Sequence, residues 1–87
     1  MHFTAFEWDE RNASHIGEHQ VTIEDAEEAC GHHPLILKSR RPRYYVFGQT
    51  NEGRYLAVIV EIKPGRIARV ITARDMSSAE RQRYLRR

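Results

Sequence analysis

The sequence predicts an α+β fold, in which an antiparallel sheet carries two N-terminal helices and one C-terminal helix. Capping signals for two short helices occur in the first third of the chain. Four short apolar runs follow, separated by turn residues, and a third capping signal comes after the last run. The 87 residues, 40% of them apolar, can form one modest core, so we expect a single domain over residues 1–87.

The N-terminal third predicts a strand and two helices. Residues Phe3–Trp8 alternate loosely and predict a first strand whose aromatic side chains anchor the core. Asp9 can cap a helix that runs to about His19. Thr22 can start the second helix through a capping box, and Gly31 marks its end.

The rest of the chain predicts a four-stranded meander and a final helix. Two of its turns contain a glycine where a positive φ is expected, which indicates hairpins. The predicted strands are Leu35–Leu37, Tyr44–Thr50, Arg54–Ile62 and Arg66–Ala73. Ser77 and Glu80 form a capping box for a helix reaching Arg87, and its Tyr84 and Leu85 are expected to face the sheet.

Charge is divided unevenly along the chain. Residues 1–37 carry eight acids and one base, whereas residues 38–87 carry thirteen bases and four acids. The C-terminal part is therefore expected to attract a polyanion. The longest apolar run, Leu56–Val60, is too short to span a membrane, and no signal peptide is evident. A lone cysteine, Cys30, fits a reducing cytoplasm and a buried apolar role.

Arginine outnumbers lysine twelve to two, and four tyrosines lie among the basic residues. Arginine forks bind phosphate, and tyrosines can stack on unpaired bases, so the pattern favours RNA binding. The simpler alternative is a solvated, arginine-rich surface. Arg74 stands at the exit of the last predicted strand, next to the basic helix, which suits it to hold a phosphate.

Strand alternation places Glu61 on a mostly apolar face of its strand. Arg69 lies on the neighbouring strand, so the two residues predict either a structural ion pair or a general base beside a phosphate clamp. The two faces of the last strand are similarly apolar, and its parity therefore stays open.

His15 and His19 are spaced four residues apart and face the same way on the first helix. That spacing suits zinc, but no third ligand or HExxH motif accompanies them, so neither metal nor cofactor is expected. A structural role is the main alternative, and a role in proton transfer or RNA contact is another.

The ordered set of motifs resembles the BrnT-type toxins of bacterial type II toxin–antitoxin modules. The matching segments are Phe6–Asp9, His19, Val21–Ala26, Gly48–Thr50, Gly53–Arg54, Val70–Arg74, Glu80–Arg81 and Tyr84. The resemblance implies a RelE-like fold, with a four-stranded meander plus an N-terminal strand. It also implies ribonuclease activity that stops translation and neutralisation by a cognate antitoxin protein.

Our first hypothesis is a metal-independent endoribonuclease toxin that acts in the cytoplasm. Arg74 and Arg69 would stabilise the charge of the transition state, and Glu61 or His19 would transfer the proton. The residues expected to hold RNA are Arg40, Arg41, Arg43, Arg54, Arg81 and Tyr84. The rival hypothesis is a non-catalytic module of the same fold that binds RNA or an acidic antitoxin segment. The expected assembly is a homodimer or a hetero-oligomer with the antitoxin.

Overall fold

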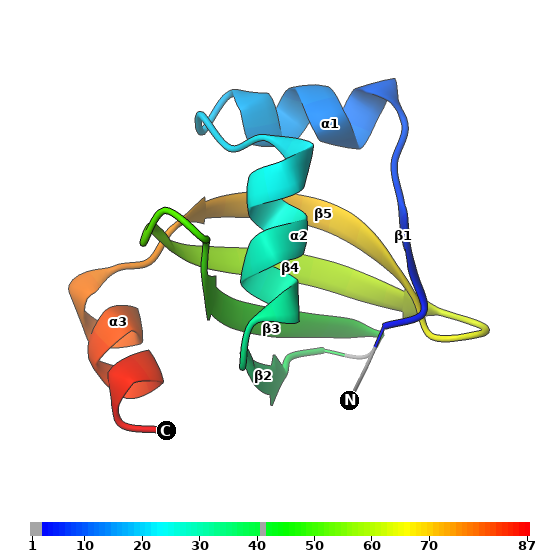
Figure 1. The fold of residues 1–87 in the computed structure, drawn as a ribbon. Helices are drawn as coiled ribbons and strands as arrows, with labels where there is room; N and C mark the ends of the chain where they lie inside the picture. The colour runs from blue at the N-terminus through cyan, green and yellow to red at the C-terminus, as the bar shows by residue number, and fades with distance from the viewer. Residues whose placement is uncertain (1–2, 41) are drawn as a thin grey trace.

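The computed structural model describes residues 3–40 and 42–87 and contains five strands and three helices (Figure 1). Their order is β1 (Ala5–Glu7), α1 (Glu10–Gly17), α2 (Ile23–Gly31), β2 (Leu35–Lys38), β3 (Arg43–Gln49), β4 (Tyr55–Lys63), β5 (Ile67–Asp75) and α3 (Ser78–Leu85). The predicted α+β class and the order of elements are confirmed. No helix in the described ranges is long and apolar enough to cross a membrane.

The strands form one sheet in the order β1-β5-β4-β3-β2. The meander from β2 to β5 is antiparallel, as predicted. The expectation of a wholly antiparallel sheet is wrong at one edge, because β1 runs parallel to β5, with Ala5 opposite Ile67. Local pattern cannot reveal this pairing, since about sixty residues separate the two strands and α1 and α2 lie between them along the chain.

Each helix begins at a capping box, in which side chains accept hydrogen bonds from backbone N–H groups of the first turn. The side chains of Asp9, Thr22 and Ser77 accept from the backbone three residues on, and the partner side chains bond back. Helix α1 ends at Gly17, two residues earlier than predicted, because the chain turns and Gln20 adopts a left-handed φ of 61°. The local sequence thus sets the helix starts more sharply than their ends.

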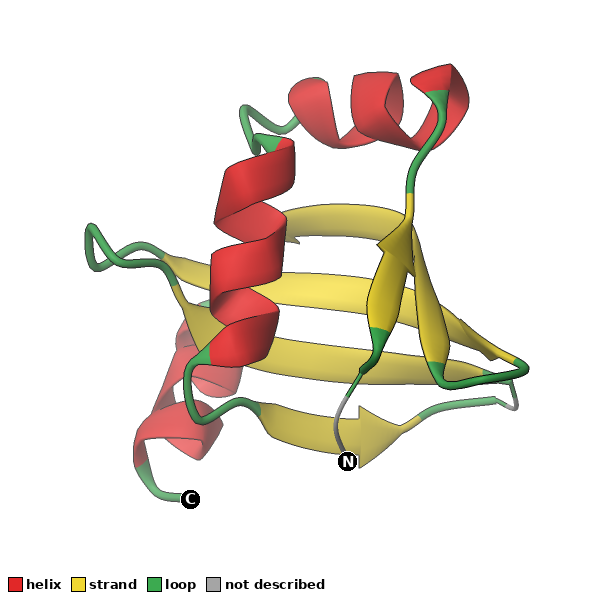
Figure 2. Cartoon of the chain, turned by 45° about the vertical axis from the view of Figure 1, so that its right-hand side comes forward, coloured by secondary structure: helices red, strands yellow, loops and turns green. Residues whose placement is uncertain are grey.

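The two faces of the sheet are covered unequally. Helices α1 and α2 pack on one face over the main core, whereas the short helix α3 lies behind the sheet at one end (Figure 2). Tyr84 of α3 is buried in a second, smaller cluster with Phe47 and Ala57 of the sheet. Leu85 is 56% exposed, so the expectation that it faces the sheet is wrong. One residue turns a helix by about 100°, which carries Leu85 away from the face that buries Tyr84.

A β-bulge in β5 decides the parity that the sequence left open. Val60 pairs with Val70, but Ile59 pairs with Thr72, so Ile71 is an extra residue on β5. Val70 and Ala73 consequently both enter the main core, although three positions separate them. The same shift places Arg69 and Arg74 together on the opposite face of the sheet.

Candidate functional site

The sheet face turned away from α1 and α2, called the open face here, carries the candidate site. Strand register arranges its residues in three cross-strand rows. The rows are Arg43–Glu61–Arg69, Tyr45–Ile59–Thr72 and Phe47–Ala57–Arg74. Helix α3 covers the third row, whereas the first two rows are half-buried apart from the exposed Arg43. An acid, an aromatic ring and several guanidinium groups therefore share one accessible surface.

A recess of about 440 Å³ opens at the Glu61 end of this face. Its lining includes Arg40, Arg43, Tyr45 and Ile59. The volume lies within the range of small-ligand pockets. Within the described residues, no ion pair involves Arg40, Arg43 or Glu61, so their charges are available to a ligand.

Arg69 binds the acids at the start of the chain instead of Glu61. Its Nη1 donates to Glu7 Oε1 at 2.9 Å and lies 3.0 Å from Asp9 Oδ2. The hydrogen bond from Arg69, together with Lys63 at 3.2 Å, lowers the pKa of Glu7. The structural Glu61–Arg69 pair considered from the sequence is therefore not formed, because Glu7 at the end of β1 and Asp9 at the start of α1 bind the guanidinium instead.

Arg74 is held at the other end of the open face by an acid of α3. Its Nη1 and Nη2 donate to the two carboxylate oxygens of Glu80, at 2.7 and 3.0 Å. This bidentate pair, helped by the Ser77 backbone N–H, lowers the pKa of Glu80 to about 2. The sequence indicated Glu80 only as a capping residue, and its contact with Arg74 was missed.

Arg69 and Arg74 lean apart in the structure. Their partners on β4, Glu61 and Ala57, are four residues apart, about 13 Å at the rise of an extended strand. Arg69 leans toward β1 and Arg74 toward α3. The two guanidinium groups consequently do not form one clamp.

We expect the Arg74–Glu80 pair to make stability fall in acid. The pKa of Glu80 is about 2 in the folded state, against an ordinary value of 4.5. Its stabilising contribution is therefore fully present above about pH 4.5 and is lost as the pH falls toward about 2. Glu80→Gln keeps the capping box but removes the charge. Urea unfolding should show a wild-type advantage that is constant from pH 6 to about pH 5 and shrinks from there to pH 2.5, and an advantage that stays constant down to pH 2.5 would contradict this assignment.

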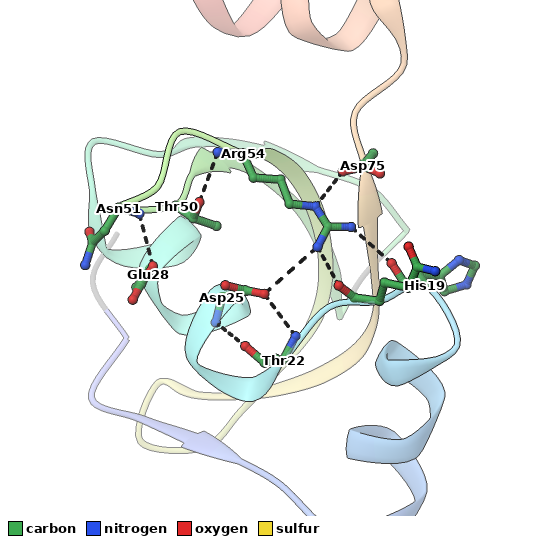
Figure 3. Close-up of polar contacts among 9 residues, drawn as sticks. His19, Thr22, Asp25, Glu28, Thr50, Asn51, Arg54 and Asp75 are labelled. Carbon is green, nitrogen blue, oxygen red and sulfur yellow. Dashed lines mark hydrogen bonds and ion pairs between the residues drawn. The ribbon is translucent and has the colours of Figure 1, made fainter.

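Arg54 forms a clasp between three segments (Figure 3). Its Nε donates to Asp75 Oδ1 at 2.7 Å, and its terminal nitrogens donate to the carbonyls of Gln20 and His19, the latter at 3.1 Å. Asp25 lies 4.0 Å away, at the start of α2. The clasp joins the α1–α2 turn to the end of β5, so Arg54, expected to hold RNA, is engaged within the protein.

Replacing Arg54 by alanine is expected to destabilise the fold by about 1–2 kcal/mol. The loss follows from charged hydrogen bonds to Asp75 and to two carbonyls of the turn that contains the left-handed Gln20. Urea denaturation measures it, with the exposed Arg83→Ala as the matched control. Equal unfolding free energies for the two variants would show that the clasp contributes nothing.

His15 and His19 lie apart from the open face. His19 is exposed in the α1–α2 turn, its carbonyl is bound by Arg54, and its ring points away from that guanidinium (Figure 3). The rings of His15 and His19 are 5.8 Å apart. Across residues 3–40 and 42–87, no three His, Cys, Asp or Glu side chains come together in a way that could hold a metal.

The remaining expected RNA contacts have different settings. The Arg81 guanidinium lies 4.1 Å from the centre of the Tyr55 ring. Tyr84 is only 3% exposed and packs edge-on against Tyr55, so its ring is not available to stack on a base. Arg41 lies outside the described residues.

These features define a small α+β protein with a half-open sheet face that combines a half-buried acid, a tyrosine and several arginines. A family model described as "Ribonuclease toxin, BrnT, of type II toxin-antitoxin system" matches residues 8–80. The chain therefore belongs to the BrnT toxin family, and the resemblance seen in its motifs is confirmed.

The comparison with solved structures agrees with this assignment. The crystal structure of the Brucella abortus ribonuclease toxin BrnT superposes with a TM-score of 0.68 at 22% sequence identity. The match covers 85% of this chain and 97% of the Brucella chain, so the two proteins share one fold along nearly their whole length. No curated protein matches the sequence.

Proposed function

We propose that this protein is a metal-independent endoribonuclease toxin that stops translation and is neutralised by a cognate antitoxin. Membership of the BrnT family supports the toxin and ribonuclease class. The observation that carries the chemical proposal is that Glu61, which forms no ion pair within the described residues, lies opposite Arg43, and that Arg43 lines the recess together with Arg40 and Tyr45.

Cleavage would use a nucleophile that the substrate itself contains. The 2′-hydroxyl attacks the adjacent phosphorus, and Glu61 takes its proton. The bond from phosphorus to the 5′-oxygen breaks, and this oxygen receives a proton from water or from the protonated Glu61. The products are a 2′,3′-cyclic phosphate and a free 5′-hydroxyl. Arg43 and Arg40 would stabilise the negative charge that develops on the phosphorane oxygens, and Tyr45 would support a neighbouring base.

Arg74 and Arg81 would bind RNA further along the same face. Arg74 lies two rows from Glu61, and Arg81 follows Glu80, the partner of Arg74, on α3. We therefore assign Arg74 to a neighbouring phosphate, not to the reacting one that our sequence hypothesis gave it. Arg69 contributes positive potential close to Glu61 while it remains bound to Glu7 and Asp9.

Glu61 is the better candidate base than His19 on geometry. Arg54 binds both the His19 carbonyl and the Asp75 side chain. Asp75 pairs with Leu56, which lies at the opposite end of β4 from Glu61. The distance between these ends is about 17 Å at the rise of an extended strand. Arg40 and Arg43, which form no ion pair within the described residues, lie toward the Glu61 end. A proton acceptor must be within hydrogen-bond reach of the reacting hydroxyl.

The test is cleavage of a long single-stranded RNA by the purified protein in the presence of EDTA. The wild type should cleave, and Arg74→Ala should lower kcat/KM by about 10- to 100-fold, mainly through a higher KM, because it loses one phosphate contact. The exposed Arg11→Ala, on α1 away from the open face, should keep the wild-type rate. Intact RNA in every lane would reject the ribonuclease proposal.

The second candidate is a binding module without catalysis. Arg69 and Arg74 already pair with carboxylates of this chain, which favours this candidate because fewer arginines remain for catalysis. In the described chain, the recess arginines Arg40 and Arg43 have no such partners. RNA affinity that falls steeply with salt, in a protein that cleaves nothing, would support this candidate.

A further inference from the structure

Strand β2 leaves one side of its backbone directed away from the sheet. It is the edge strand next to β3, and the Ser39 N–H donates to the Arg43 carbonyl at 3.1 Å. Backbone direction alternates along an antiparallel pair, so Leu35 and Leu37 bond to β3. The N–H and C=O groups of Ile36 and Lys38 therefore point outward.

The opposite edge of the sheet is formed by β1, which has only three residues and is too short to pair with a long segment. Beside β5, β1 pairs with Ile67–Arg69, and the Asn12 side chain donates to the Val70 carbonyl at 3.0 Å. Ala73 is fully buried at that edge. Strand β2 has neither a proline nor a bulge, and Lys38 is its single charged residue. Of the described edges, β2 is the one that can accept another strand.

A hollow lies beside this edge. It measures about 470 Å³, and its lining combines the apolar Phe3, Phe6, Pro34 and Ile36 with His32 and His33. A strand added to β2 would direct alternate side chains toward this hollow, because side chains alternate between the faces of a sheet. An incoming strand therefore requires apolar residues at every second position.

Charge selects the kind of partner. From residue 29 to residue 51 the chain contains no acid and four bases, Lys38, Arg40, Arg41 and Arg43. A second copy of this chain would add the same bases to the same edge, whereas a segment with acidic residues would compensate them. Lys38 protects this edge against pairing with itself. The acids of the incoming strand would alternate onto the other face, the side on which Arg43 lies.

We infer that β2 accepts an extended protein segment of alternating acidic and apolar residues, which adds a sixth strand to the sheet. This inference rests on the proposed function in one respect, because the antitoxin is the partner expected to supply the segment. Main-chain hydrogen bonds to Ile36 and Lys38 provide affinity, and the hollow and the basic residues provide specificity.

The test is an NMR titration of the ¹⁵N-labelled full chain with the peptide acetyl-Glu-Val-Glu-Val-Glu-Val-Glu-amide. The largest amide shifts are expected at Ile36 and Lys38. Lys38→Pro removes an outward N–H that β3 does not use, and a proline is tolerated at such an edge position. Lys38→Ala is the matched control, since it loses the same charge but keeps the donor. Lys38→Pro should bind at least about fivefold more weakly than Lys38→Ala.

Several results would overturn the inference. These are the absence of peptide-induced shifts at β2, equal binding by the two variants, and equal binding of a peptide with lysine in place of glutamate. Sedimentation that shows a dimer abolished by Lys38→Pro would assign the edge to a second copy instead. The titration contains no RNA, so it measures peptide binding at β2 even if the protein does not cleave RNA. Lys38→Pro should cleave RNA at the wild-type rate if the proposed function holds.

Discussion

Replacing Glu61 by glutamine is expected to slow RNA cleavage by about 100- to 10,000-fold, the range for loss of a positioned general base. Glu61 is half-buried beside the recess, and no ion pair within the described chain depends on its charge. The substitution keeps the size of the side chain and removes only its ability to accept a proton. The fold should therefore remain intact while kcat falls, which single-turnover cleavage of RNA in EDTA would measure.

His19→Gln provides the comparison that separates the two proton acceptors considered from the sequence. Its exposed ring lies beyond the far end of β4 from Glu61, so we expect the rate to stay close to that of the wild type. If His19→Gln loses activity and Glu61→Gln retains it, the reaction takes place at the α1–α2 turn and not on the open face.

Replacing Gly48 by alanine is expected to cost about 3 kcal/mol or more of folding free energy. A Cβ on Gly48 would lie 1.8 Å from the carbonyl oxygen and 2.6 Å from the carbonyl carbon of Ala29. These are backbone atoms of α2, so the helix itself must move away from β3, and overpacking of this kind lies at the upper end of measured costs. The loss is a large part of the roughly 5–15 kcal/mol that stabilises a domain.

Gly17→Ala is the matched control, because nothing lies within 4 Å of its added Cβ and its φ is not left-handed. We expect its unfolding free energy to stay within about 1 kcal/mol of the wild type. Urea denaturation of both variants gives the comparison. A Gly48→Ala protein as stable as Gly17→Ala would mean that α2 does not approach β3 as closely as the structure shows.

The open face illustrates how far sequence reasoning extends into the candidate site. Alternation along β4 correctly placed Glu61 on the same face as Ala57 and Ile59. The arginines were identified as a group, but the sequence did not show which of them are engaged. Arg54 and Arg74 bind acids of this chain, whereas the Arg40 and Arg43 guanidinium groups have no such partner in the described part. Those partners come from other elements, so no local pattern could indicate them.

By itself, the sequence determined the elements whose signals are local: the three capping boxes, the turns of the meander and the uneven distribution of charge. These depend on hydrogen bonds and backbone preferences within a few residues. Tertiary structure alone decided the parallel pairing of β1 with β5, the bulge at Ile71 and the clasp of Arg54. Each of these joins residues far apart along the chain, and its geometry follows from how the packed elements meet. The sequence therefore identified the types of residue on the surface, whereas the tertiary structure determined which of them lie together in a site.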